Sequence, residues 1–161
     1  MLKTTHKNLL VLICSILCTH AATTKAETMT VSAAESTLKR QQFQFGIHKL
    51  DAELARTAEE RQRGLMFRES LAENQGMMFQ FSQADHYCMW MKNTLIPLSI
   101  AFIDEQGKII NIEEMQANSE QTTCAKNKAR YALEMNAGWY SQRQIKAGQQ
   151  VEGLPLKDNQ Q

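Results

Sequence analysis

The sequence predicts a mainly β or α+β fold, a small and compact β-barrel-like domain with two short helices. Three observations lead to this prediction. The apolar segments are short, several alternate with polar residues, and glycines or other turn residues separate them. Only two segments carry the start and stop signals of a helix.

Two strands and a helix open the domain. We expect strands over residues 43–47 and 50–55, because the second segment alternates apolar and acidic side chains. Thr57 and Glu60 have the spacing of a capping box, in which each side chain accepts a hydrogen bond from the other's backbone N–H. A short helix should therefore begin at residue 58 and end at Gly64, a residue suited to follow a helix.

The rest of the domain should be mostly strands. They are expected over residues 77–81, 86–91, 98–103, 108–115 and 131–135. Residues 104–107 form a turn in which Gly107 can adopt a positive φ, so residues 99–115 should make a hairpin. A second short helix should follow Asn136 and run to Ile145, before a last strand at 150–154.

The first 26 residues are typical of a secretory signal peptide. Lys3 and Lys7 precede an uncharged apolar run over residues 9–17, and small residues follow. A bilayer-spanning helix needs about 20 apolar residues, so an uncleaved anchor is the less favoured alternative. We expect cleavage after Ala26, with Ala21 or Ala22 as alternatives.

The expected organisation follows from this leader. It is a signal peptide (1–26), a flexible lead-in (27–42), a single domain (43–155) and a disordered tail (156–161). The protein is expected in the periplasm or secreted, as a monomer without a transmembrane segment after cleavage.

The charge balance argues against one class of partner. The chain has 18 Lys and Arg and 17 Asp and Glu, and the leader removes Lys3, Lys7 and Lys25 but no acid. The exported part thus has 15 basic and 17 acidic residues, without a cluster of Lys and Arg. Nucleic-acid binding is therefore not expected.

Two cysteines follow the leader, Cys88 and Cys124. In an oxidising compartment such a pair forms a disulfide more often than a metal or redox site. A sequence alone cannot establish that the two Cβ atoms lie close enough for a disulfide, so two buried free thiols are the alternative.

Several segments, in their order and spacing, resemble the bacterial family of domain of unknown function 192. They are residues 57–68 (TAEERQRGLMFR), 76–79 (GMMF), 89–98 (MWMKNTLIPL), 100–104 (IAFID) with Gly107, and 131–134 (YALE) with Gly138 and Gly148. The resemblance implies a small β-barrel-like domain with a couple of short helices, often exported, with no accepted activity, cofactor or catalytic residue. Members often have Asp where this chain has Ser99, so a function that needs that carboxylate would be missing here.

The segment from Trp90 to Thr94 is the first candidate site. Trp90, Lys92, Asn93 and Thr94 could line the mouth of a pocket, where an aromatic face and a few polar groups orient a small ligand. The alternative is a strand end followed by an ordered loop, because Asn93 and Thr94 can bond the nearby backbone.

Arg68 and Glu134 are the second candidate site. Arg68 could form a bidentate pair with Glu134 or with a carboxylate of a ligand. Strand alternation places Glu134 on the face opposite Leu133 and Met135. The alternative is an internal ion pair or a solvated face.

Neither a cofactor nor a metal site is expected. His86, Cys88, Met89 and Met91 offer donors to Cu(I), but strand alternation sends Cys88 and Met89 to opposite faces, and no second histidine lies nearby. The methionines are better explained as core residues. No serine lies in a nucleophile elbow and no glycine loop could bind a phosphate.

These observations favour binding over catalysis. We expect an exported binding or accessory protein for an unknown small molecule or a cell-envelope protein. One alternative is an assembly or stability factor for an envelope machine. Another is a small hydrolase-like enzyme with a buried Arg/Glu/Asn site. A pocket around Arg68, Asn93 and Glu134, with Glu134 resisting ionisation, would favour the enzyme. A shallow or absent pocket beside an exposed apolar patch would favour a protein partner.

Overall fold

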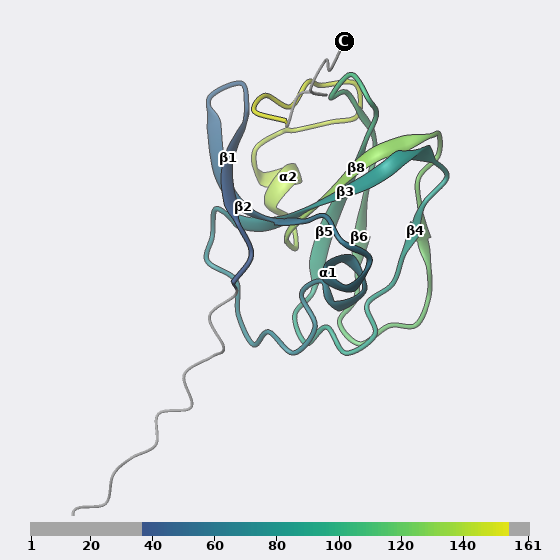
Figure 1. Cartoon of the computed structure of the whole chain (residues 1–161). Coiled ribbons are helices and arrows are strands. Elements are labelled where there is room, and N and C mark those ends of the chain that lie inside the picture. The colour runs from purple at the N-terminus through teal and green to yellow at the C-terminus, as the bar shows by residue number, and fades with distance from the viewer. Residues whose placement is uncertain (1–36, 155–161) are drawn as a thin grey trace, which may run out of the picture. The chain divides into compact units, whose positions relative to one another are not determined.

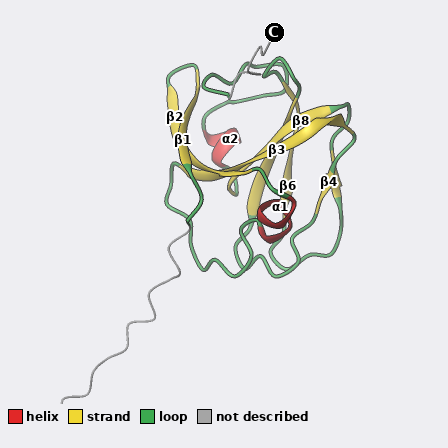
Figure 2. Ribbon diagram, in the orientation of Figure 1, coloured by secondary structure: helices red, strands yellow, loops and turns green. Residues whose placement is uncertain are grey.

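The computed structural model describes residues 37–154. The predicted signal peptide, most of the predicted lead-in and the predicted tail lie outside the described residues. The elements are β1 (Arg40–Phe45), β2 (His48–Ala55), α1 (Ala58–Arg63), β3 (Gln75–Asp85), β4 (Cys88–Met89), β5 (Leu98–Ile103), β6 (Ile109–Met115), β7 (Thr123–Cys124), β8 (Ala129–Asn136) and α2 (Trp139–Gln142) (Figures 1 and 2).

Six of the strands form one sheet in the order β1-β2-β3-β8-β5-β6. Only β2 and β3 run parallel, and α1 lies in the connection between them. The strands β4 and β7 form a separate two-stranded sheet. The prediction of a sheet-rich α+β fold with two short helices is confirmed.

The sheet does not close into a barrel, so that part of the expectation needs correction. Its edge strands β1 and β6 do not pair with each other. The segment after α2 touches both edges through isolated bridges, Gln44 with Glu152 and Lys108 with Gln150. Other segments cover both faces of the sheet, so it buries its apolar side chains without closing on itself.

Successive side chains of the central strands enter two separate cores. Met78 and Leu133 belong to the first core, which also contains Trp139 of α2. Met77 belongs to the second core, which contains Leu65 of the loop after α1. Accordingly, α1 and α2 lie on opposite sides of the band formed by β3 and β8 (Figure 1). Because both faces are covered, β5 is buried along its whole length.

The first helix agrees with its prediction. It covers Ala58–Arg63, and Gly64 follows it with φ 48°. The N–H of Glu60 donates to Thr57 Oγ1 at 3.1 Å, and the N–H of Thr57 donates to Glu60 Oε2 at 2.8 Å. The N–H groups of Thr57 and Arg56 stabilise the carboxylate and lower the pKa of Glu60. The capping box therefore sets the start of α1.

Several boundaries differ from the prediction. Strand β1 begins at Arg40 rather than at residue 43, and Ile47 lies in the turn after β1 with 89% of its surface exposed. The strand expected over 86–91 is only Cys88–Met89. These differences reflect pairing, since a segment counts as strand only where a neighbour takes up its backbone hydrogen bonds.

The end of the domain also differs. Helix α2 stops at Gln142, because Gln144 has φ 57° and cannot continue a helix. Asn136 does not cap it, since its side-chain amide donates to the carbonyl oxygens of Leu71 and Ala72. The strand expected over 150–154 is reduced to the two isolated bridges.

Candidate functional site

Arg68 lies in the loop after α1 and pairs with Glu53 of β2. Its Nη2 donates to Glu53 Oε2, and Arg40 Nη1 donates to the other oxygen at 3.0 Å. Glu53 is 2% exposed, so its carboxylate is buried with two guanidinium groups around it. The predicted internal pair of Arg68 with Glu134 is therefore wrong.

The strand register explains why Arg68 does not reach Glu134. Glu53 lies opposite Met77 of β3, and Met77 lies opposite Glu134 of β8. Neighbouring strands are about 4.8 Å apart, so the two glutamates are separated by about 10 Å with the Met77 side chain between them. This register could not be predicted from the sequence, because β2 and β8 are far apart in the chain.

Glu134 occupies an apolar environment. It lies on the face opposite Leu133 and Met135, as strand alternation predicts, but this face forms the second core and is not solvated. Its neighbours across the strands are Met77 and Ile100. Within the described residues its carboxyl group has no hydrogen bond or ion pair, and it is 4% exposed. Burial raises its pKa to about 8, so the group is mostly neutral at pH 7.

The pair at Glu53 makes a testable prediction. Replacing Arg68 with Ala should lower the free energy of unfolding by about 1–2 kcal/mol, because a buried carboxylate then keeps only Arg40. The expected loss is less than for a fully buried pair because the Arg68 side chain is 27% exposed. Urea denaturation at pH 7 measures it. Arg63→Ala is the matched control, and an equal loss in that variant would contradict the role assigned to Glu53.

The Trp90–Thr94 segment forms an ordered loop joined to the loop of Arg68. The N–H of Phe67 donates to the carbonyl oxygen of Asn93 at 2.8 Å, and Asn93 has φ 57°. Lys92 and Asn93 are exposed, and Lys92 Nζ lies 5.4 Å from the centre of the Trp90 ring. Thr94 is buried, and its carbonyl oxygen accepts from the N–H of Asn118. Thr94 thus connects two loops, while Trp90, Lys92 and Asn93 face solvent.

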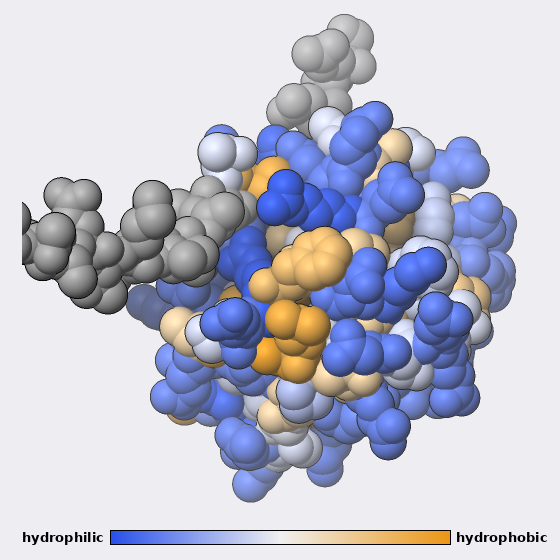
Figure 3. All heavy atoms as spheres, turned by 90° about the horizontal axis from the view of Figure 1, so that it is seen from below, coloured by the Kyte–Doolittle hydropathy of each residue, from blue (hydrophilic) through white to orange (hydrophobic). Residues whose placement is uncertain are grey.

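An apolar patch on these two loops was missed by the sequence reasoning. We define the apolar patch as Phe67, Trp90 and Leu95, which are 66%, 45% and 44% exposed. Figure 3 shows orange and tan atoms gathered at the centre of the face seen from below, where the loops lie in Figure 1. A signal was present in the sequence, because Leu65, Met66 and Phe67 follow the end of a helix directly and three consecutive loop residues cannot all face one core.

We describe two hollows in the surface. One of about 420 Å³ lies between Glu113–Gln116 and the segment from Ser119 to Cys124, and Met91 of the Trp90–Thr94 segment also lines it. Another of about 470 Å³ lies beside the β1–β2 turn and the end of α2. Neither of the two is lined by Arg68, Asn93 or Glu134.

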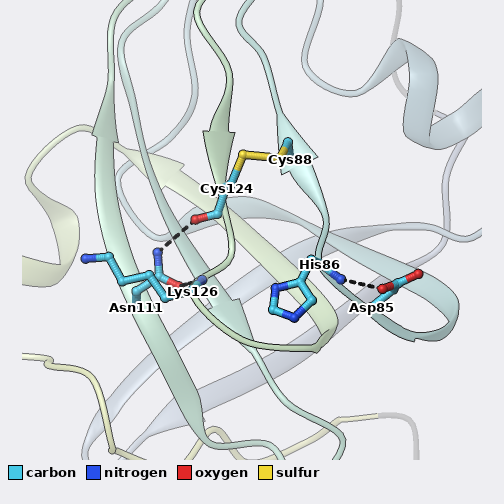
Figure 4. Close-up of a disulfide and its surroundings, with 6 residues drawn as sticks. All are labelled: Asp85, His86, Cys88, Asn111, Cys124 and Lys126. Carbon is cyan, nitrogen blue, oxygen red and sulfur yellow. Dashed lines mark hydrogen bonds between the residues drawn. A yellow bond between two sulfur atoms is a disulfide. The ribbon is translucent and has the colours of Figure 1, made fainter.

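The predicted disulfide is confirmed. Cys88 and Cys124 lie opposite each other on β4 and β7, with an S–S distance of 2.03 Å and a Cα–Cα distance of 4.0 Å (Figure 4). Both residues are exposed. Because its sulfur is bonded to Cys124, Cys88 offers no thiolate to the Cu(I) site considered above.

Two further features bear on metals and membranes. Over residues 37–154, no group of three or more His, Cys, Asp or Glu side chains is arranged to hold a metal ion. In the same part of the chain, no helix has the length and apolar character to cross a membrane.

The model of the family DUF192, described as an uncharacterized ACR, matches residues 38–153. The chain belongs to the DUF192 family. A crystal structure from Sinorhizobium meliloti 1021, described as a suspected transcription regulator, is 33% identical with a TM-score of 0.71, and the match covers 74% of this chain and 97% of that chain. A protein of unknown function from Novosphingobium aromaticivorans DSM 12444 is 34% identical with a TM-score of 0.67, over 71% of this chain and 84% of that chain. Among curated proteins, none matches the chain.

Ser99, where the resemblance implied a missing carboxylate, has a structural environment in this chain. It is fully buried, its hydroxyl donates to Glu114 Oε1 at 2.6 Å, and its oxygen accepts from the N–H of Gly138 at 2.8 Å. These bonds join β5 to β6 and to the start of α2. Ser99 therefore contributes to the sheet and lies outside the apolar patch.

Proposed function

We propose that this DUF192 protein is exported and binds a protein of the cell envelope through its apolar patch, without catalysing a reaction. The observation that carries the proposal is Phe67, an aromatic residue that is both strongly exposed and held at φ 63°. The leader-like first 26 residues support the location outside the cytosol.

The backbone of Phe67 supports a role in binding. A left-handed conformation costs an L-residue roughly 1–2 kcal/mol, and a bulky residue rarely adopts it. An exposed ring recovers little of this cost by burial in the free protein. Strained residues of this kind persist chiefly where they serve a function. The N–H of Phe67 donates to the carbonyl oxygen of Asn93, which holds the backbone of Phe67 against the neighbouring loop.

Charge around the apolar patch supports a partner of a particular kind. Residues 61–70 and 86–97, the end of α1 and the two loops, contain Arg61, Arg63, Lys92 and Arg68 but only one acid, Glu69; of these cations, Arg68 is paired with Glu53. The exported part as a whole has more acidic than basic residues, so these loops differ from the rest of the surface. A partner with apolar side chains flanked by Asp or Glu would complement them, and aromatic and Arg residues are frequent anchors of such interfaces.

Replacing Phe67 with Gly tests the proposal. Glycine adopts φ 63° without strain, so the free energy of unfolding should stay equal or rise by up to about 1 kcal/mol. Binding of the envelope partner should weaken at least about tenfold, because the central aromatic contact is lost. Crosslinking in envelope extract identifies the partner, and titration with that purified protein gives the affinity.

Ile47→Ser is the matched control, since Ile47 is more exposed than Phe67 but lies in the β1–β2 turn. It should leave the affinity unchanged. Equal weakening in both variants would contradict the assignment of the patch. Binding to anionic vesicles or to DNA, with no protein partner, would contradict the proposed function.

A further inference from the structure

We propose that the Cys88–Cys124 bridge is a substrate for thiol–disulfide exchange, and that its reduction releases the loop that carries Trp90 and Lys92. This inference rests on the proposed function, because it makes binding by the apolar patch dependent on the redox state. The bridge would then serve as a control element as well as a staple.

The position of the bridge makes it accessible. Both cysteines are exposed, unlike a disulfide enclosed in a core. Exposed disulfides are in general the labile and regulatory ones, since a thiolate can approach a sulfur atom from solvent. His86 and Asp85 lie near Cys88 on the same connection, and the N–H of His86 donates to the Asp85 carboxylate at 2.8 Å (Figure 4).

The bridge joins two segments that are attached to the domain at a few points, since Met91 and Ala125 are buried in the second core and Tyr87 stacks on Phe81. Strands β4 and β7 are each two residues long and do not pair with the six-stranded sheet. Outside this short pair, three backbone hydrogen bonds connect the two segments. They run from Ala125 to Tyr87, from Met91 to Ser119 and from Asn118 to Thr94.

The segment that ends at Cys124 is also poorly supported from beneath. The hollow of about 420 Å³ separates residues 119–124 from Glu113–Met115 at the end of β6. The side-chain Nδ2 of Asn111 donates to the carbonyl oxygen of Cys124 at 3.2 Å. The side-chain Oδ1 of Asn111 accepts from the backbone N–H of Lys126. Met91 and Ala125 keep their places in the second core, so opening the bridge is expected to loosen residues 119–124 over the hollow and the exposed side chains of Trp90 and Lys92.

The exchange needs a dithiol, either a small molecule or a thiol–disulfide oxidoreductase of the same compartment. One thiolate of the dithiol attacks Cys124 Sγ, which breaks the Cys88–Cys124 bond, and the Cys88 thiolate that leaves takes up a proton. The second thiol of the dithiol, as its thiolate, then attacks the mixed disulfide and expels Cys124, which is also protonated. The bridge gains two electrons and the dithiol is oxidised to a disulfide.

Tryptophan fluorescence tests the release without any partner. The chain has two tryptophans, and Trp139 is buried in the first core. In Trp139→Phe, the emission therefore reports on Trp90 alone. Reduction with dithiothreitol should shift this emission to longer wavelength, because Trp90 becomes more exposed to water. Hydrogen exchange of the unmodified protein should show faster exchange in residues 86–97 and 116–126, while β3 and β8 remain protected.

Two further results separate this inference from the proposed function. The double variant Cys88→Ser with Cys124→Ser should reproduce the reduced state and not respond to dithiothreitol. Its affinity for the envelope partner should be at least about tenfold lower than that of the oxidised protein. Unchanged emission and exchange after complete reduction would overturn the inference and leave the proposed function standing. If both change but Phe67→Gly binds normally, the release is supported and the proposed binding surface is wrong.

Discussion

Replacing Glu134 with Gln should raise the free energy of unfolding at pH 9 by on the order of 4 kcal/mol and leave it nearly unchanged at pH 4. Glutamine keeps the size of the side chain and removes its ionisation. Glu134 is 4% exposed and has no partner for a negative charge within residues 37–154, so its charged form is strongly disfavoured in the folded protein.

The sign follows from the two pKa values. The pKa of Glu134 lies near 8 in the folded protein, against an ordinary value of 4.5. Below pH 4.5 both the folded and unfolded states hold the proton, and the stability contributed by the neutral carboxyl is fully present. As the pH rises from 4.5 to about 8, the unfolded chain loses its proton first, so the folded state is progressively destabilised. A shift of one unit in the pKa corresponds to about 1.4 kcal/mol in the free energy of unfolding. The difference between the two pKa values of Glu134 therefore sets an upper value for the expected loss of stability.

Urea denaturation between pH 4 and pH 9 measures this effect. The protein should lose stability across the range, and Glu134→Gln should lose much less. Glu69→Gln, at an exposed position, is the control and should follow the unmodified protein. Equal pH dependence in Glu134→Gln and the unmodified protein would show that Glu134 is charged and paired in the folded state.

Removing the disulfide should have the next largest effect. The double replacement of Cys88 and Cys124 with Ser should lower the free energy of unfolding by about 3–4 kcal/mol in the chain-entropy model, since the cysteines are 36 residues apart. A domain of this size usually has a stability of about 5–15 kcal/mol, so the variant should remain folded. Urea denaturation of the oxidised, reduced and double-variant proteins measures the loss.

The reduced protein and the double variant should lose the same amount. A loss below about 1 kcal/mol in both would mean that the bridge does not constrain the unfolded chain, and its role would be limited to exchange. A loss in the reduced protein alone would point to an effect of the free thiols.

Local features of the structure could be predicted from the sequence because neighbouring residues determine them. The capping box of Thr57 and Glu60 fixes the start of α1, and Gly64 fixes its end. The hairpin of β5 and β6 likewise depends on its own turn at Asp104–Gly107. The pairing of the two cysteines could also be predicted, because a single pair after the predicted leader has few alternatives in an oxidising compartment.

Features that depend on distant strands could not be predicted. In the strand order β2-β3-β8-β5, Glu53 of β2 lies beside Met77 of β3, and Glu134 of β8 lies two strands away from Glu53. This arrangement explains why Arg68 pairs with Glu53 and not with Glu134. Strand alternation correctly placed Glu134 on the face opposite Leu133 and Met135. It could not reveal that this face of the sheet is also covered, by the second core. The exposure of Phe67 was indicated by the apolar run from Leu65 to Phe67, but its contact with the loop of Asn93 forms only in the folded chain.

In-cell crosslinking at position 67 tests the central claim most directly. A photoreactive phenylalanine replaces Phe67 in the full chain, cells are irradiated, and the crosslinked product is identified by mass spectrometry after fractionation. The proposal predicts a product in the envelope fraction that joins a specific envelope protein to a chain lacking its first residues, with cleavage after Ala26, Ala22 or Ala21. A full-length chain in the cytosolic fraction, with no crosslink from position 67, would contradict it.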